Sequence, residues 1–127
     1  ERAAFGRKIG GFQGLAYRLV EMATRVELAK SLLYKGAWLV GRSRQAPGLR
    51  NESIKIASML KWSGARLAVD ACDLLVDVYG GSGYFTEEDV SRWYTFAKQL
   101  ELVEGTKEVQ KNAIARIILG DELARTF

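Results

Sequence analysis

The feature of this sequence with the clearest chemical potential is a carboxylate beside a glycine turn. Residues 104–110 read Glu-Gly-Thr-Lys-Glu-Val-Gln, which predicts a hinge at Glu104-Gly105 and a helix start near Thr106. A carboxylate on a hinge can be aimed into a cleft, and a buried carboxylate has a raised pKa and can act as a general base near neutral pH. The alternative role is structural, because acidic side chains near a helix start complement the helix dipole.

Two other segments carry motifs that become informative when they are taken together. Residues 79–84 read Tyr-Gly-Gly-Ser-Gly-Tyr, and residues 2–9 read Arg-Ala-Ala-Phe-Gly-Arg-Lys-Ile, with Phe12-Gln13 shortly after. With residues 104–110, they resemble the C-terminal domain of the acyl-CoA dehydrogenase flavoproteins over nearly the whole chain. The family pattern reads Arg-x-x-Phe-Gly-(basic)-x-Ile-x-x-x-Gln, then Gly-Gly-x-Gly-Tyr, then Glu-Gly-Thr-x-(Glu/Gln)-(Ile/Val)-Gln.

The resemblance implies a reaction and a set of site residues. In the family, the carboxylate at the position of Glu104 removes the α-proton of an acyl-CoA thioester, and the β-hydrogen leaves as hydride to FAD, giving a trans-2-enoyl-CoA. The resemblance also implies that Gly105 is a substrate-binding residue. The positions that match flavin contacts are Arg2, Phe5, Gln13, Gly80, Gly81, Thr106 and Glu108. Asp77 stands where the family usually has Gln, and a carboxylate near a pyrophosphate is unfavourable unless it turns away or is protonated.

The resemblance also implies a larger assembly. We expect residues 1–127 to be the C-terminal helical domain of a longer flavoprotein, inactive without an N-terminal helical domain and a central β-domain. Family members form homotetramers and pass electrons to an electron-transfer flavoprotein. Three alternatives share the fold: a catalytically silent partner subunit, a DNA-binding member and an acyl-CoA oxidase. Retention of Glu104 argues against the silent subunit.

Composition bounds the class of protein. The 127 residues, 48% hydrophobic and 27% charged, suit one globular domain. A single cysteine excludes a disulfide within the chain, and the absence of histidine excludes a classical triad; no cluster has metal-ligand spacing. The net charge of +4 permits a nucleic-acid partner, but the dispersed basic residues argue against one. No stretch is long and apolar enough to span a membrane. We expect a cytoplasmic protein, or one of the mitochondrial matrix if its source is eukaryotic.

Hydrophobic periodicity predicts an all-α, antiparallel four-helix bundle with two long and two shorter helices. The first helix covers about 12–40, with an inward stripe that includes Leu19, Leu33 and Ala37. The second covers about 51–79 with Asn51 as N-cap, and its wide apolar arc predicts a central position. The third begins after an N-cap at Thr86 and ends near residue 100. Inward positions predicted for the last two helices are Val90, Trp93, Tyr94, Ala97, Val109, Ala113, Ile117 and either Leu119 or Leu123.

Overall fold

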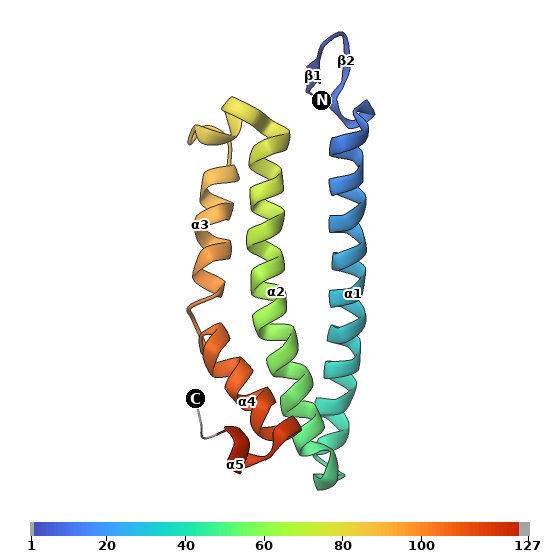
Figure 1. Cartoon of the computed structure of the whole chain (residues 1–127), viewed down its shortest axis with the longest axis vertical. Helices are drawn as coiled ribbons and strands as arrows, with labels where there is room; N and C mark the ends of the chain where they lie inside the picture. The colour runs from blue at the N-terminus through green and yellow to red at the C-terminus, as the bar shows by residue number, and fades with distance from the viewer. Residues whose placement is uncertain (1, 125–127) are drawn as a thin grey trace.

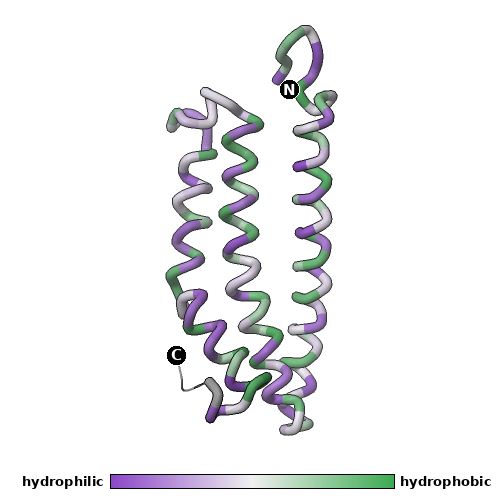
Figure 2. The backbone as a smooth tube through the Cα atoms, viewed as in Figure 1, coloured by the Kyte–Doolittle hydropathy of each residue, from purple (hydrophilic) through white to green (hydrophobic). Residues whose placement is uncertain are grey.

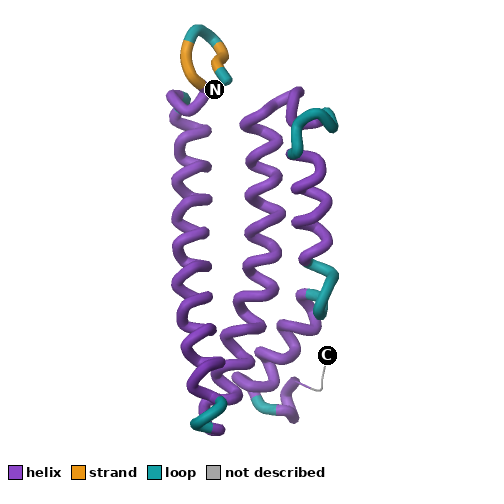
Figure 3. Tube along the Cα trace, turned by 180° about the vertical axis from the view of Figure 1, so that it is seen from behind, coloured by secondary structure: helices purple, strands orange, loops and turns teal. Residues whose placement is uncertain are grey.

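Four helices form most of the molecule. The computed structural model describes residues 2–124, with only the backbone for residues 123 and 124. Helices α1 (Gln13–Ser43) and α2 (Arg50–Tyr79) run antiparallel side by side, while α3 (Val90–Leu100) and α4 (Lys107–Leu119) follow one another along the other side of α2 (Figure 1). Figure 3 shows the same arrangement from behind, with short loops joining the helices. The predicted all-α bundle of two long and two shorter helices is confirmed.

Helix α2 is the centre of the fold, as its wide apolar arc predicted. It contacts α1, α3 and α4. Apolar and polar residues interleave along every helix (Figure 2). Its buried residues are Ser53, Ile56, Ser58, Ala65, Val69 and Leu74. Because α2 is covered on two sides, it ties α1 to the segment that carries the Glu104-Gly105 hinge.

Two predicted N-caps are wrong. Asn51 lies inside α2 because a 3₁₀ turn, Pro47–Leu49, opens the helix earlier and leaves Leu49 at the cap position. Proline fixes φ near the helical value, so it suits the first turn of such a segment. Thr86 and the acidic residues after it form turns, and α3 begins only at Val90, after Asp89. The helix start predicted near Thr106 is confirmed, and Thr106 occupies the cap position, although its side chain caps no backbone N–H.

The inward stripe of α1 differs from the prediction at Leu19, which is exposed, and throughout its second half. Leu33 and Ala37 are exposed, whereas Leu32 is half-buried and Gly36 and Leu39 are buried. Steps of four residues drift around a helix of 3.6 residues per turn, while alternating steps of three and four stay on one face. The glycine at the close approach is Gly36, where a Cβ would lie 3.4 Å from Ile56 Cγ2. At Gly64 of α2, by contrast, a Cβ would meet open space.

The two shorter helices are less buried than their sequence predicts. Val90 and Ala97 are buried as expected, and Tyr94, Ala113 and Ile117 are half-buried. Other apolar residues at predicted core positions are exposed: Trp93 of α3, and Val109 and Leu119 of α4. Leu19 of α1 is exposed as well. The side chain of Leu123 lies outside the described residues. An apolar helical stripe identifies a face that needs cover, but the cover need not come from the same chain.

A small hairpin precedes α1, although no strand was predicted. Strands β1 (Ala3–Ala4) and β2 (Arg7–Lys8) pair antiparallel, and a 3₁₀ turn, Ile9–Gly11, leads into α1. Phe5 and Gly6 form the two-residue turn with φ of 52° and 77°, as a hairpin turn of the I′ kind requires. Strands of two residues are too short to show an alternating pattern. Among the described residues, no helix has the length and hydropathy needed to cross a membrane.

Candidate functional site

The hinge between α3 and α4 holds Glu104 in an unusual backbone conformation. Glu104 has φ of 56° and Gly105 has φ of 97°, so both lie in the left-handed region. Phe5 and Glu104 are the non-glycine residues with positive φ in the described part of the chain. A side chain in this region costs about 1–2 kcal/mol, and such strain concentrates at functional sites when the surroundings hold it in place. The Glu104 side chain is exposed in this chain.

The segment before the hinge is fixed to α2. Lys61 Nζ donates a hydrogen bond to the carbonyl of Leu100 at 2.5 Å. Beyond it, the N–H groups of Leu102 and Val103 donate to the carbonyl of Gln99 at 2.9 and 3.1 Å. The end of α3 therefore closes in a short turn that is anchored to the central helix at Leu100, four residues before Glu104.

The segment after the hinge is an ordinary helix start. Thr106 occupies the cap position, and the N–H of Gln110 donates to its carbonyl at 3.0 Å. Glu108 accepts hydrogen bonds from its own N–H and from the Thr106 hydroxyl, and these hold the pKa of Glu108 below its usual range. Thr106 at the cap position and the acidic Glu108 in the first turn are the residue types expected at a helix N-terminus. The N–H groups of this turn are also suited to an anionic ligand.

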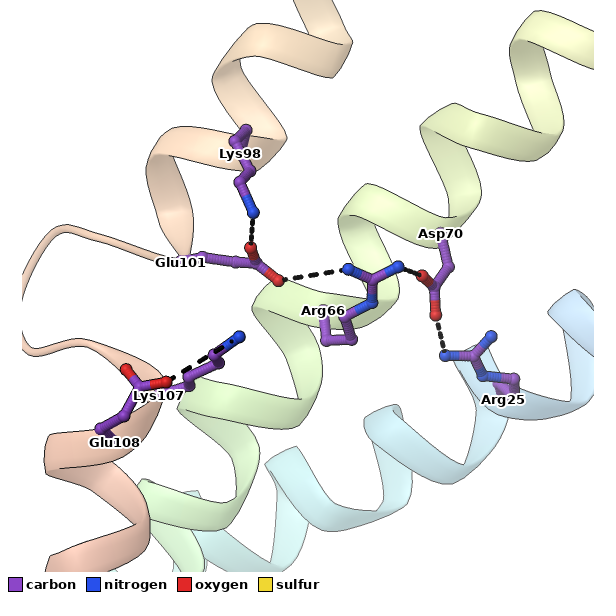
Figure 4. Close-up of polar contacts among 7 residues, drawn as sticks. All are labelled: Arg25, Arg66, Asp70, Lys98, Glu101, Lys107 and Glu108. Atoms are coloured by element: carbon purple, nitrogen blue, oxygen red, sulfur yellow. Dashed lines mark hydrogen bonds and ion pairs between the residues drawn. The ribbon is translucent and has the colours of Figure 1, made fainter.

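An ion-pair chain crosses three helices beside the hinge, and sequence reasoning missed it (Figure 4). Glu101, at the end of α3, has a nearly buried side chain that pairs with Lys98 and lies 3.7 Å from Arg66 of α2. Arg66 also pairs with Asp70 at 2.5 Å, and Asp70 pairs with Arg25 of α1 at 2.5 Å. The hydrogen bond from Lys98 is the largest effect holding the pKa of Glu101 below its usual range.

Sequence spacing could have indicated the ion pairs within one helix, but not the ion pairs between helices. Lys98 and Glu101 are three residues apart, and Arg66 and Asp70 are four apart, which are spacings that place side chains together on a helix. The contacts from Arg66 to Glu101 and from Asp70 to Arg25 join different helices. Oε1 of Glu101 is buried and, among the described residues, accepts no hydrogen bond. Its charge is balanced through Arg66 and Lys98 at the base of the hinge.

The predicted flavin residues Arg2 and Gly80 meet at the other end of the bundle. Arg2 Nη1 donates to the carbonyls of Asp77 and Val78, at 3.2 and 3.0 Å, where α2 ends. Gly80 has φ of 62°, and a Cβ there would lie 2.2 Å from Arg2 Nη1. The backbone therefore favours glycine at this position, and a Cβ there would displace the guanidinium end of Arg2. A basic side chain at a helix C-terminus is also favourable to the helix dipole.

Asp77, the departure from the family pattern, is paired away from Arg2. Its carboxylate accepts a hydrogen bond from Arg18 of α1 at 2.6 Å. The unfavourable charge is therefore balanced by a cation of the same domain. A cavity of about 570 Å³ lies between the hairpin and the end of α2. It is lined by Arg2, Lys8, Ile9, Gly10, Val78, Tyr79, Ser82 and Glu88.

The remaining predicted flavin residues lie near this end without lining the cavity. Phe5 is 95% exposed at the tip of the hairpin and makes an edge contact with Phe12 at 6.1 Å between ring centroids. Gln13 begins α1 and donates a hydrogen bond to the hydroxyl of Tyr17. Gly81 lies in the 3₁₀ turn Gly80–Tyr84, where a Cβ would meet open space.

The predicted site residues thus fall into two groups. Arg2, Gly80 and their neighbours lie at the hairpin end, whereas Glu104, Gly105, Thr106 and Glu108 surround the hinge. The 11 residues of α3 separate the groups along the bundle, a rise of about 16 Å at 1.5 Å per residue. Within the described chain they do not form one pocket.

The comparisons with known proteins agree with this fold and these motifs. The family model for "Acyl-CoA dehydrogenase, C-terminal domain" matches residues 1–119. The chain is 36% identical over 119 residues to the "Probable acyl-CoA dehydrogenase YngJ" of Bacillus subtilis, covering 94% of this chain and 30% of that protein.

Solved structures show the same fold at similar coverage. A structure of glutaryl-coenzyme A dehydrogenase in complex with glutaryl-CoA matches with a TM-score of 0.79 at 31% identity, over 94% of this chain and 29% of that one. An FAD complex of PigA matches with a TM-score of 0.81 at 26% identity, over 94% and 29%. The chain therefore spans about 30% of the length of the relatives it matches. The chain belongs to the acyl-CoA dehydrogenase family and corresponds to its C-terminal domain.

Proposed function

We propose that this chain is the C-terminal helical domain of a longer, FAD-dependent acyl-CoA dehydrogenase. The longer enzyme would convert an acyl-CoA thioester to a trans-2-enoyl-CoA. One observation carries the proposal: in a member of this family, Glu104 lies on a left-handed hinge that is anchored to the central helix on its α3 side. Holding a carboxylate in a strained conformation is understandable if its direction matters for chemistry.

Glu104 would act as the base. Its carboxylate would take the α-proton of the acyl thioester, a task that needs an oxygen within hydrogen-bond reach of that proton. In this chain the side chain is exposed, so the acyl-CoA and the remainder of the enzyme would have to cover it. Removal of water disfavours the charged form of a carboxylate and makes it a stronger base. Gly105 would allow the substrate to approach the backbone closely, since it has no side chain.

The residues at the hairpin end fit an anionic dinucleotide. FAD, when bound, would accept the β-hydrogen of the substrate as hydride. A guanidinium has five N–H groups, so the two carbonyl contacts of Arg2 are compatible with a further contact to a phosphate. Gly80 leaves the space that Arg2 occupies, and Arg18 balances Asp77.

The two groups of residues suggest how the cofactor would be shared. We propose that they contact flavins in an assembly of several copies, with Arg2, Phe5, Gln13, Gly80 and Gly81 in one group. Thr106 and Glu108, at the start of α4, belong to the other. The exposed apolar side chains of α1, α3 and α4 favour a homo-oligomer, which in this family would be a tetramer. An electron-transfer flavoprotein would accept the electrons.

A titration of the longer protein tests the proposal. Purified protein should carry a yellow flavin, and one member of a panel of acyl-CoAs should bleach its visible absorbance without oxygen. The isolated 127-residue chain is the control, and it should neither retain flavin nor respond. Rapid recolouring by oxygen would indicate an acyl-CoA oxidase instead. A colourless protein, or one that no acyl-CoA bleaches, would contradict the dehydrogenase and favour a silent or nucleic-acid-binding member.

A further inference from the structure

The side chain of Gln110 folds back from the first turn of α4 onto the hinge. Its Nε2 donates a hydrogen bond to the carbonyl of Glu104 at 3.2 Å, and the side chain is half-buried. The same nitrogen would lie 2.8 Å from a Cβ at Gly105, and Val109 Cγ1 would lie 3.5 Å away. The Gln110 side chain therefore covers Gly105 and also contacts the backbone of Glu104.

The hydrogen bond from Gln110 contacts the part of the hinge whose backbone is in the left-handed region. The carbonyl of Glu104 belongs to the peptide unit between Glu104 and Gly105, both of which have positive φ. A donor held against that carbonyl fixes the orientation of the peptide unit. The backbone before the hinge is fixed separately, through Lys61 and the ion pairs of Glu101. Gln110 supplies the corresponding restraint on the α4 side.

We infer that Gln110 is a positioning residue that keeps the Glu104 backbone left-handed and so aims the Glu104 carboxylate. The inference rests on the proposed role of Glu104 as base. Gln110 touches no reacting atom itself and acts through the direction of Glu104. A misplacement of about 1 Å at a reacting group can cost roughly 100-fold in rate. Loss of the Gln110 donor should therefore slow proton removal by roughly 10- to 100-fold.

The first test uses this chain and needs no activity. Gln110→Met keeps the length of the side chain and removes the donor, and Asn112→Leu, an exposed position of the same helix, is the matched control. Backbone ¹⁵N relaxation should give order parameters of about 0.85 for Glu104 and Gly105 in wild type and in the control. In Gln110→Met they should fall toward about 0.6, the range of flexible backbone. Unchanged order parameters at both residues would overturn the inference.

A second pair of variants keeps this test valid if Gln110→Met disturbs the fold. Gln110→Glu is nearly isosteric and, when ionised, has no donor, while Asn112→Asp adds the same charge at the exposed position. Gln110→Glu should loosen Glu104 and Gly105, and Asn112→Asp should not. Equal order parameters at the hinge in these two variants would refute the role of the amide donor.

The second test measures flavin reduction in the longer enzyme. Gln110→Met should lower the limiting rate constant of bleaching by roughly 10- to 100-fold with acyl-CoA affinity nearly unchanged. In a Glu104→Gln background it should cause no further decrease, because it acts through Glu104. A normal rate in Gln110→Met, when Glu104→Gln is slow, would refute the positioning role alone. A normal rate in Glu104→Gln itself would instead refute the proposed base.

Discussion

Replacing Gly105 by alanine should destabilise the domain, and the structure allows the size of the effect to be worked out. Gly105 has φ of 97°, and a side chain at positive φ costs about 1–2 kcal/mol. The new Cβ would lie 2.8 Å from Gln110 Nε2, so that side chain must move and lose its hydrogen bond to Glu104, about 0.5–1.5 kcal/mol. The lower entropy of the unfolded alanine chain offsets about 0.5 kcal/mol. The net loss should be about 1–3 kcal/mol.

Urea unfolding of the 127-residue chain measures this loss directly. The midpoint should fall with an unchanged slope, and the melting temperature should fall by roughly 4 °C per kcal/mol for a domain of this size. Gly64→Ala is the matched control. It makes the same chemical change inside α2, where the Cβ meets open space, and should stabilise by about 0.5–1 kcal/mol. The reasoning is refuted if Gly105→Ala is as stable as wild type.

Three further predictions concern other parts of the chain. Burial favours a higher pKa for Asp70, but the hydrogen bonds from Arg25 and Arg66 outweigh it and hold its pKa below its usual range. The ionised Asp70 carboxylate therefore stabilises the fold fully above its unfolded pKa of about 3.9, and this stabilisation is lost as pH falls through the folded pKa. At low pH the urea midpoint of wild type should approach that of Asp70→Asn. A constant gap would contradict this. Burial raises the pKa of the Cys72 thiol, so iodoacetamide should alkylate Cys72 more slowly than free cysteine at neutral pH; an equal rate would show an accessible thiolate. Arg2→Ala in the longer protein should weaken flavin retention, and retention as tight as wild type would exclude a phosphate contact for Arg2.

The sequence predicted the helical bundle well because helix formation depends on local spacing. The apolar arc of α2 indicated its central position, and glycines marked the ends of α2 and the hinge after α3. Helix starts were harder. Pro47 opened α2 earlier than the capping preference of Asn51 indicated, and the acidic run after Thr86 formed turns in place of a first helical turn.

Side-chain burial was predicted less well, for a physical reason. Trp93 and Val109 continue apolar stripes, yet no element of the described chain covers them fully. Periodicity shows that a face is apolar and does not show which molecule lies against it. The stripe of α1 drifted because the predicted positions followed steps of four residues.

The candidate site was also predicted only in part: its local motif was predicted, and its contacts between distant segments were not. The motif around Glu104 is continuous in sequence, so the glycine hinge was predicted, although the left-handed backbone of Glu104 itself was not. Contacts between distant segments could not be predicted from spacing alone. Arg2 meets the carbonyls at the end of α2, more than seventy residues away, and Glu101 meets Arg66 across two helices. These contacts depend on how the helices pack.

The most direct test of the central claim is rapid mixing of the longer enzyme, as Glu104→Gln, with its acyl-CoA. Glutamine keeps the shape of the side chain and removes its basic oxygen. If Glu104 is the base, flavin and acyl-CoA binding should stay nearly intact, while flavin bleaching slows by about 10²–10⁴-fold, the usual contribution of a general base. Bleaching at a near-normal rate in Glu104→Gln would contradict the account, because the proton would then be removed by a group elsewhere in the enzyme.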